Sequence, residues 1–260
     1  MNLLPAMPAT VPRPTQPRLR IFRSSPAPQL ELPAVSFFGR SLDEYTRFFA
    51  LDLPVLRGRA VLDVAGGPSS FTAEACRRGV DAVAADPLYA EGPATLSAQV
   101  REDYANMFAQ MRAKRSLLKF GPAGFVSLAA AEADRRAAAQ RFLADFEAHH
   151  AHGRYMSAAL PRLPFFDGAF DLVLCAHLLF TYARRFDYAW HLAACVELAR
   201  VSAGEVRIHP LCGLDGRRYP EMERLRRELQ DHAIASRIVR VPYEFFVGTN
   251  TMLVLNPQAS

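Results

Sequence analysis

Two aspartates flank a turn of small residues in the first third of the chain. Asp63 lies in an apolar run that leads into Ala65, Gly66 and Gly67, and Asp86 follows about 20 residues after the glycines. Small residues let the backbone approach a ligand closely, and a carboxylate at this distance can accept hydrogen bonds from both hydroxyl groups of a ribose. The pattern predicts a site for a cofactor that contains a nucleoside.

His177 is the candidate catalytic residue. It directly follows the apolar run 170–176, at the carboxyl edge where open α/β sheets bind ligands. Its ordinary pKa lies near neutral pH, so it could remove a proton from an oxygen or nitrogen nucleophile. The alternative is a histidine that only packs or forms hydrogen bonds at the start of a helix.

Four further side chains are candidates for lining a substrate pocket: Tyr89, Tyr104, Tyr182 and Arg207. Their alternative roles are structural, because aromatic residues in helices usually pack in the core and alternate residues of a strand point outward.

Three histidines, His149, His150 and His152, lie close together near the end of an expected helix. Adjacent residues on a helix point in different directions, and no carboxylate motif accompanies these histidines. We therefore expect a solvated helix end here and no metal site.

Strands and helices must alternate to position these residues. We expect strands at 60–64, 81–85, 154–158, 170–176, 205–210, 237–245 and 251–256. We expect helices from Ser41 to about residue 50, from Ser69 or Ser70 to 78, and near 180–200 and 219–234, with Ser41 and Glu44 forming a capping box. This alternation predicts a parallel sheet, and the last two strands are close enough in sequence to pair as an antiparallel hairpin.

Residues 91–150 carry helical patterns without strands, which predicts a helical insertion. Tyr104, Met107, Phe108 and Met111 form an apolar surface at helical spacing. The insertion could act as a lid over the carboxyl edge of the sheet, or its apolar surface could belong to the core.

The chain is predicted to hold one domain, 36–260, preceded by a disordered tail, 1–35, that is rich in proline and arginine. Four arginines and no acid lie in residues 1–30, so they supply +4 of the net charge of +5 and leave +1 for the rest. A nearly neutral domain disfavours nucleic acid as a partner.

The sequence also disfavours a membrane or an exported location. No apolar stretch approaches the ~18 residues of a membrane span, and prolines interrupt the N-terminal region where a secretory signal would lie. Four scattered cysteines without a Cys-x-x-Cys pair predict neither disulfides nor zinc, and they favour the cytoplasm.

The segment 61–71, Val-Leu-Asp-Val-Ala-Gly-Gly-Pro-Ser-Ser-Phe, followed by Asp86, resembles the first motif of class I S-adenosylmethionine-dependent methyltransferases. The segment 163–175, Leu-Pro-Phe-Phe-Asp-Gly-Ala-Phe-Asp-Leu-Val-Leu-Cys, resembles the run before the fourth strand in their small-molecule branch. The resemblance implies a Rossmann-like α/β fold: a seven-stranded, mostly parallel sheet with a C-terminal antiparallel hairpin.

The same resemblance implies that S-adenosyl-L-methionine is the cofactor. Asp63 would meet its amino-acid end and Asp86 its ribose. The full set implied for cofactor binding is Asp63, Ala65, Gly66, Gly67, Ser69, Asp86 and Pro87. Ala65 and Ser69 stand where the family has glycines, and Ala158 or Ala159 stands where an acid often contacts adenine, a role that Ser157 or a backbone amide could take.

We therefore expect methyl transfer by in-line displacement to an unidentified small-molecule acceptor, without a metal. The alternatives are a non-catalytic binding protein on a methyltransferase scaffold, or an RNA or protein methyltransferase. An NAD-dependent dehydrogenase is disfavoured, because the chain lacks Gly-x-Gly-x-x-Gly.

Overall fold

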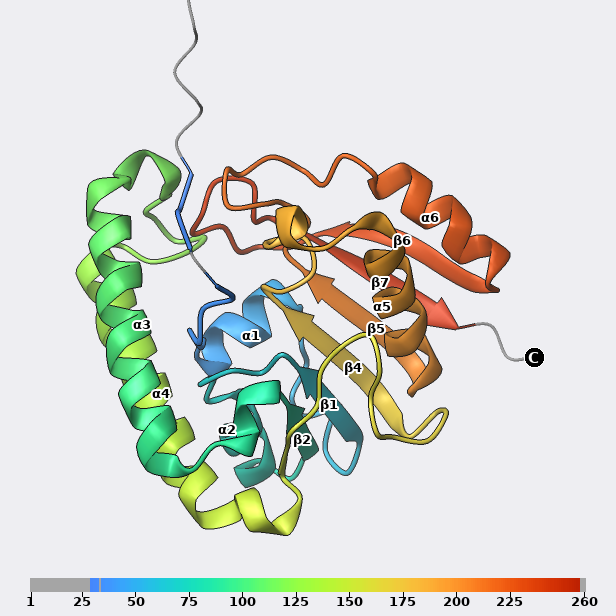
Figure 1. The fold of residues 1–260 in the computed structure, drawn as a ribbon, viewed down its shortest axis with the longest axis horizontal. Helices are drawn as coiled ribbons and strands as arrows, with labels where there is room; N and C mark the ends of the chain where they lie inside the picture. The colour runs from blue at the N-terminus through green and yellow to red at the C-terminus, as the bar shows by residue number, and fades with distance from the viewer. Residues whose placement is uncertain (1–28, 33, 258–260) are drawn as a thin grey trace, which may run out of the picture.

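The computed structural model describes residues 29–32 and 34–257. Its centre is one seven-stranded sheet with the order β3-β2-β1-β4-β5-β7-β6 (Figure 1). The strands are β1 (Ala60–Val64), β2 (Asp81–Ala85), β3 (Tyr155–Met156), β4 (Phe170–Ala176), β5 (Ser202–His209), β6 (Ile234–Arg240) and β7 (Thr251–Pro257). Strands β1 to β5 pair in parallel, and β7 pairs antiparallel with β5 and β6. This is a Rossmann-like α/β fold with a seven-stranded, mostly parallel sheet and a C-terminal antiparallel pair, which confirms the predicted fold class.

Side chains of the central strands alternate between two apolar layers. In β1, Val61 packs in one layer and Leu62 in the other, and in β4, Leu174 and Val173 divide in the same way. A parallel strand covered on both faces must be apolar in both directions, so it is read as a continuous apolar run. That is why the bounds of β1, β2 and β4 match the predicted strands.

Helices cover both faces of the sheet (Figure 1). One apolar layer includes side chains from α1 (Leu42–Phe48), α2 (Phe71–Arg77), α3 (Pro93–Ala113) and α4 (Leu128–His149). The other includes side chains from α5 (Tyr188–Arg200) and α6 (Met222–Asp231). Short 3-10 turns complete the chain: η1 (Pro87–Ala90), η2 (Arg115–Leu117), η3 (His150–His152) and η4 (Ala183–Arg185).

The start of α1 corrects one detail of the prediction. The Ser41 hydroxyl caps the helix by accepting from the Glu44 amide at 3.3 Å. The Glu44 carboxylate does not return to Ser41 as a capping box requires; it is fully buried and binds Arg135 of α4. Glu44 therefore binds Arg135, a residue distant in sequence, and does not cap the helix as the local spacing predicts.

The predicted strand 237–245 is displaced, because β6 begins at Ile234 and ends at Arg240. Pro242 has no amide hydrogen for a ladder, and the following backbone bonds to the inserted segment instead. Glu244 donates its amide to Ala123 at 2.8 Å, and Phe245 accepts from the Lys119 amide at 2.8 Å. The loop between β6 and β7 therefore spans 241–250 and packs on the insertion.

Most of the predicted tail lies outside the described residues, but its last part contacts the domain. Leu30 is 5% exposed, and its amide donates to the Leu214 carbonyl at 3.3 Å. The Lys114 ammonium donates to the Gln29 carbonyl at 2.6 Å. The packed part of the chain therefore begins by Gln29, before the predicted boundary at residue 36, because Leu30 supplies an apolar anchor.

The described helices include none that is both long and apolar enough to cross a membrane. Among residues 29–32 and 34–257, no group of three or more His, Cys, Asp and Glu side chains is arranged to hold a metal ion. His149 and His150 each contact a backbone carbonyl one helical turn earlier through Nδ1, at 3.0 and 2.8 Å.

Candidate functional site

Two adjoining cavities open at the carboxyl edge of β1, β2 and β4. The first, which we call the His177 cavity, encloses about 850 Å³, part of it open to solvent. The second, the Pro87 cavity, encloses about 970 Å³, part of which is also open to solvent. Their shared lining residues are Val35, Ser36, Ala65, Asp86 and Leu178. In this sheet β1 has β2 on one side and β4 on the other, and such a switch of strand order is where open α/β sheets bind ligands.

The turn after β1 brings backbone to the boundary of the cavities. Ala65 has φ +56° and Gly67 has φ +52°, and both line the His177 cavity. A Cβ on Gly66 would lie 2.9 Å from Asp63 Oδ2 and from the Tyr89 hydroxyl, so only glycine fits there. Ala65 adopts the left-handed conformation, which glycine adopts more easily. Its backbone amide donates a hydrogen bond to the Ala85 carbonyl at 2.8 Å, which fixes the turn to β2.

Asp86, the residue that the sequence predicts to bind ribose, directly follows β2 and borders both cavities. Its side chain accepts from the Gly67 amide at 3.1 Å and from the Leu88 amide at 3.0 Å. These bonds orient the carboxylate and tie it to the glycine turn. Burial raises its pKa to about 6, although the two amides act in the opposite direction.

This pKa leads to a prediction about pH. If Asp86 binds a ribose, as the sequence predicts, the hydroxyls would donate to the ionised carboxylate and binding would lower the pKa of Asp86. The affinity would then be retained above pH 6 and lost as the pH falls below it. We expect the affinity for S-adenosylhomocysteine, measured by calorimetry, to fall by up to about tenfold per pH unit below 6. Asp86→Asn should remove this slope. An equal slope in Asp86→Asn would assign the titration to another group.

Asp63 lies behind the glycine turn and lines neither cavity directly. It is 1% exposed and accepts from the Tyr45 hydroxyl at 3.0 and 3.2 Å. Burial raises its pKa to about 8, the Tyr45 hydrogen bond opposes the shift, and Asp86 adds to it. Ser69 supports the same turn, because its hydroxyl accepts from the Arg40 amide at 3.1 Å.

The Pro87 cavity has an apolar wall suited to a flat aromatic ring. Pro87 and Leu88 line it from one side, and Ala158, Ala159 and Leu160 from the segment after β3. Phe186 and Trp190, stacked with 3.8 Å between ring centroids, complete the wall. Ser157 does not line it; its hydroxyl donates to the Pro87 carbonyl at 3.3 Å. Shape and apolar contact are what this wall offers an adenine.

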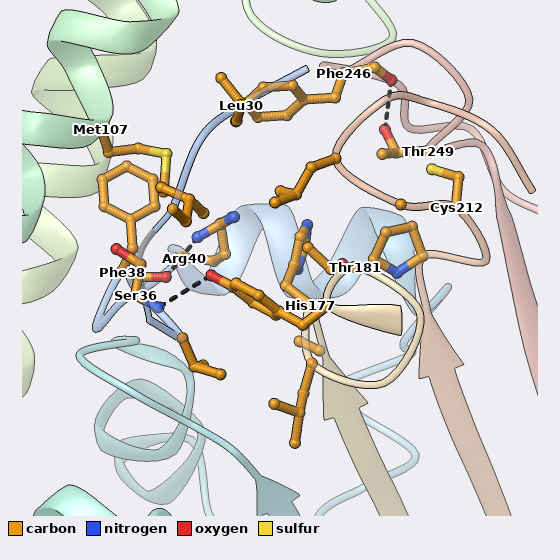
Figure 2. A pocket seen from close by; sticks show the side chains of 18 of the residues that line it. Leu30, Ser36, Phe38, Arg40, Met107, His177, Thr181, Cys212, Phe246 and Thr249 are labelled. Carbon is orange, nitrogen blue, oxygen red and sulfur yellow. Dashed lines mark hydrogen bonds between the residues drawn. The ribbon is translucent and has the colours of Figure 1, made fainter. Parts of the chain in front are cut away.

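His177 lies at the end of β4 and faces the His177 cavity (Figure 2). Its backbone has φ +53°, and its amide donates to the His209 carbonyl at 2.6 Å, which holds the residue at the strand end. Within the described residues its buried Nδ1 has no hydrogen-bond partner. Burial, followed by nearby Arg40, lowers its pKa well below the usual value, so the ring is neutral at neutral pH and is a weaker base than an exposed histidine.

Of the four predicted substrate residues, only Tyr182 lines the His177 cavity, and its hydroxyl accepts from the Ser36 amide at 3.0 Å. Tyr89 supports the glycine turn by donating to the Gly67 carbonyl at 2.7 Å, and Tyr104 is buried, accepting from the Gly39 amide at 3.2 Å. Arg207 binds the carbonyls of Phe49 and Ala50, at 2.8 and 3.2 Å, beside an ion pair with Glu205. None of these three lines either cavity, because each serves packing within the domain.

The sequence interpretation missed a large share of the His177 cavity. The segment before α1 contributes Ser36, Phe38 and Arg40, and the loops after β5 and β6 contribute Cys212, Phe246 and Thr249. Figure 2 shows these side chains around one space with His177 and Thr181. No spacing in the sequence marked them, because their segments meet only through the sheet.

Comparisons with known proteins extend the description of the fold. No protein-family model matches the chain. An uncharacterized protein of Methanocaldococcus jannaschii is 28% identical over 228 residues, which cover 87% of this chain and 98% of that protein.

Three solved structures illustrate the similarity. A SAM-dependent methyltransferase of Aquifex aeolicus is 16% identical, with a TM-score of 0.40 over 83% of this chain and 94% of its own. Magnesium protoporphyrin IX methyltransferase of Synechocystis PCC 6803 with bound SAM is 14% identical, with a TM-score of 0.39 over 79% and 74%. A putative RNA methyltransferase of Pyrococcus horikoshii is 9% identical, with a TM-score of 0.43 over 84% and 85%. The function proposed below rests on the residues of the site.

Proposed function

We propose that this protein binds S-adenosyl-L-methionine and transfers its methyl group to a small-molecule acceptor. The observation that carries the proposal is the meeting of two cavities at Asp86 and the glycine turn. One cavity has an apolar wall beside a carboxylate, and the other holds a neutral histidine. This division suits a nucleoside in the first and a reacting pair in the second.

The residues of the turn and the Pro87 cavity fit the cofactor. The Asp86 carboxylate, oriented by two amides, would accept from the ribose hydroxyls, and the apolar wall would cover the adenine. Gly67 lines the His177 cavity without a side chain, so its backbone is open to a close approach, and Gly66 is needed for the turn because a Cβ there would meet Asp63 and Tyr89. Asp63 accepts a hydrogen bond from Tyr45 behind the turn, and its pKa of about 8 keeps it largely protonated at neutral pH; an ammonium group bound nearby would favour its ionised form.

The cofactor, when bound, supplies an electrophilic sulfonium methyl. In the displacement a lone pair of the acceptor forms a bond to the methyl carbon, and the carbon–sulfur pair returns to sulfur, giving S-adenosylhomocysteine. His177 would accept the proton that an acceptor hydroxyl or amine loses; in support, its neutral ring lines the cavity. The cavity walls hold the reactants together and limit water, and such positioning supplies a large part of the rate.

The His177 cavity favours a small acceptor. Met107 and Met111 of α3 and Leu117 form part of its wall, so the insertion after β2 contributes directly to the space. Methionine side chains adapt to the shape of an apolar ligand. We propose that this insertion, rather than the cofactor half, selects the acceptor.

Calorimetry with S-adenosylhomocysteine tests the cofactor half of the proposal. We expect micromolar affinity, about −8 kcal/mol, for the unaltered protein. Ala158→Phe should abolish binding by filling the Pro87 cavity. Ala151→Phe, at an exposed position in η3, is the matched control and should bind normally. No heat and no thermal shift at millimolar ligand would contradict the proposal.

A further inference from the structure

A buried ionic cluster beside the His177 cavity contains two buried guanidinium groups and one fully buried carboxylate. Arg135 Nη2 lies 2.6 Å from Glu44 Oε1, and Arg135 Nε lies 3.0 Å from Glu44 Oε2. The Tyr243 hydroxyl also donates to Glu44. Glu44 and Arg135 are fully buried, so one carboxylate neutralises one guanidinium. Arg40, near both of them and 7% exposed, is the second guanidinium.

Another acid, Asp134 of α4, lies near Glu44 and Arg135; it is partly buried, and burial raises its pKa. Burial raises the pKa values of Tyr104, Tyr182 and Tyr243, so their hydroxyls stay neutral. Burial lowers the pKa of His209 to about 3 and that of His177 well below its usual value, so both rings are neutral as well. Among the described residues, Arg40 is therefore the guanidinium of this cluster that has no carboxylate partner.

One edge of the Arg40 guanidinium forms hydrogen bonds with backbone carbonyls, and the other edge has no hydrogen-bond partner among the described residues. Its Nη1 donates to the carbonyls of Phe38 and Gly39, at 2.6 and 3.1 Å. Among the described residues, Nε is buried without any partner, and no carboxylate forms an ion pair with Arg40. Figure 2 shows the side chain between Phe38 and His177, at the floor of the cavity. A buried charge without a partner is costly, so this edge is suited to a ligand.

We infer that Arg40 binds the carboxylate of a ligand in the His177 cavity. Two parallel N–H groups on one guanidinium edge match the two oxygens of a carboxylate. A carboxylate brings one negative charge to this one unpaired guanidinium, whereas a phosphate monoester would bring nearly two negative charges into a mostly apolar space. The apolar lining from Leu30, Met107 and Phe246 would contact the body of the same ligand.

Two ligands can supply this carboxylate. For one of them, the cofactor, the inference rests on the proposed function. One source is the amino-acid end of the cofactor, and the other is an acidic, apolar acceptor. Both would lie beside Arg40 and His177.

The first arm of the test compares S-adenosylhomocysteine with 5′-methylthioadenosine, which lacks the amino-acid group. If the cofactor supplies the carboxylate, Arg40→Met should weaken S-adenosylhomocysteine by about 10- to 100-fold and leave 5′-methylthioadenosine unchanged. Arg40→Lys keeps the positive charge but not the planar guanidinium, so it should weaken the binding of S-adenosylhomocysteine by a smaller factor than Arg40→Met does. Arg59→Met is the control, since Arg59 lies at the surface and lines neither cavity.

The second arm measures 4-phenylbutyrate against 4-phenylbutan-1-ol, with and without saturating S-adenosylhomocysteine. If the acceptor supplies the carboxylate, the acid should bind about 10- to 100-fold more tightly than the alcohol, and Arg40→Met should abolish this preference. This arm does not require cofactor binding. It therefore still tests Arg40 if the protein binds neither S-adenosylhomocysteine nor 5′-methylthioadenosine, an outcome that would refute only the proposed function.

Removing a buried, unpaired charge should leave the thermal midpoint of Arg40→Met unchanged or higher. If Arg40→Met fails to fold, Arg40→Lys is used in its place to compare the two adenosine ligands and to compare the acid with the alcohol. A preference for the carboxylate that depends on Arg40 in either arm supports the inference. A protein that shows no such preference in either arm, or folded Arg40 variants that retain it in full, would overturn it.

Discussion

Replacing Asp86 with alanine is expected to weaken the binding of S-adenosylhomocysteine by about 10- to 100-fold, because a charged acceptor contributes about 1.5–3 kcal/mol per hydrogen bond. The carboxylate borders both cavities and is held by the amides of Gly67 and Leu88. Its loss removes the acceptor for the ribose and also releases the glycine turn. Calorimetry at pH 7.5 measures the change directly.

Asp81→Ala provides the matched control for this substitution. Asp81 begins the same strand, at its opposite end, and is exposed. It should bind S-adenosylhomocysteine as the unaltered protein does. Asp86→Asn should show an intermediate loss, since one amide oxygen can still accept. If Asp86→Ala binds normally while folded, Asp86 does not belong to the cofactor site.

The largest expected effect on stability comes from Glu44. Glu44→Ala should lower the free energy of unfolding by about 3–5 kcal/mol, because it leaves Arg135 buried without its partner and Arg40 beside it. Urea denaturation followed by circular dichroism measures the change. A carboxylate this deeply buried, with two guanidinium groups nearby, is an uncommon concentration of charge in a core.

The neighbouring acid supplies the control. Asp43 is 74% exposed and lies 3.7 Å from Arg47, so Asp43→Ala should change stability by no more than about 0.5 kcal/mol. A second variant, Arg135→Met combined with Glu44→Leu, should recover much of the loss, since it removes both charges together. Equal stability of Glu44→Ala and Asp43→Ala would show that the ion pair contributes nothing.

The sequence predicts the sheet well where a strand is apolar on both faces, as in Val61–Val64 and 170–176. It predicts the positions of Asp86 and His177 because both follow such strands directly. It does not predict Arg40. An arginine before a capping serine resembles any surface residue, and its burial depends on Phe38, on α4 and on the loop after β6.

The predicted residues whose side chains contact other parts of the domain share one physical cause. Tyr89, Tyr104 and Arg207 are predicted at a pocket from their chemistry, but the side chain of each forms a hydrogen bond with the backbone elsewhere in the domain. Glu44 was expected at a helix cap from its spacing, but the guanidinium of Arg135 offered a stronger, charged partner. Interactions between segments far apart in sequence decided these residues, and local patterns do not contain that information.

The Glu44 carboxylate joins three parts of the chain that are distant in sequence. Arg135 comes from the inserted helix α4, 91 residues away, and Tyr243 comes from the loop before β7, 199 residues away. Opening α4 alone would leave a charged group of α1 without compensation inside the protein. The insertion after β2 is therefore coupled to the sheet, and α4 is expected to unfold together with the domain in one cooperative transition rather than as a detachable unit.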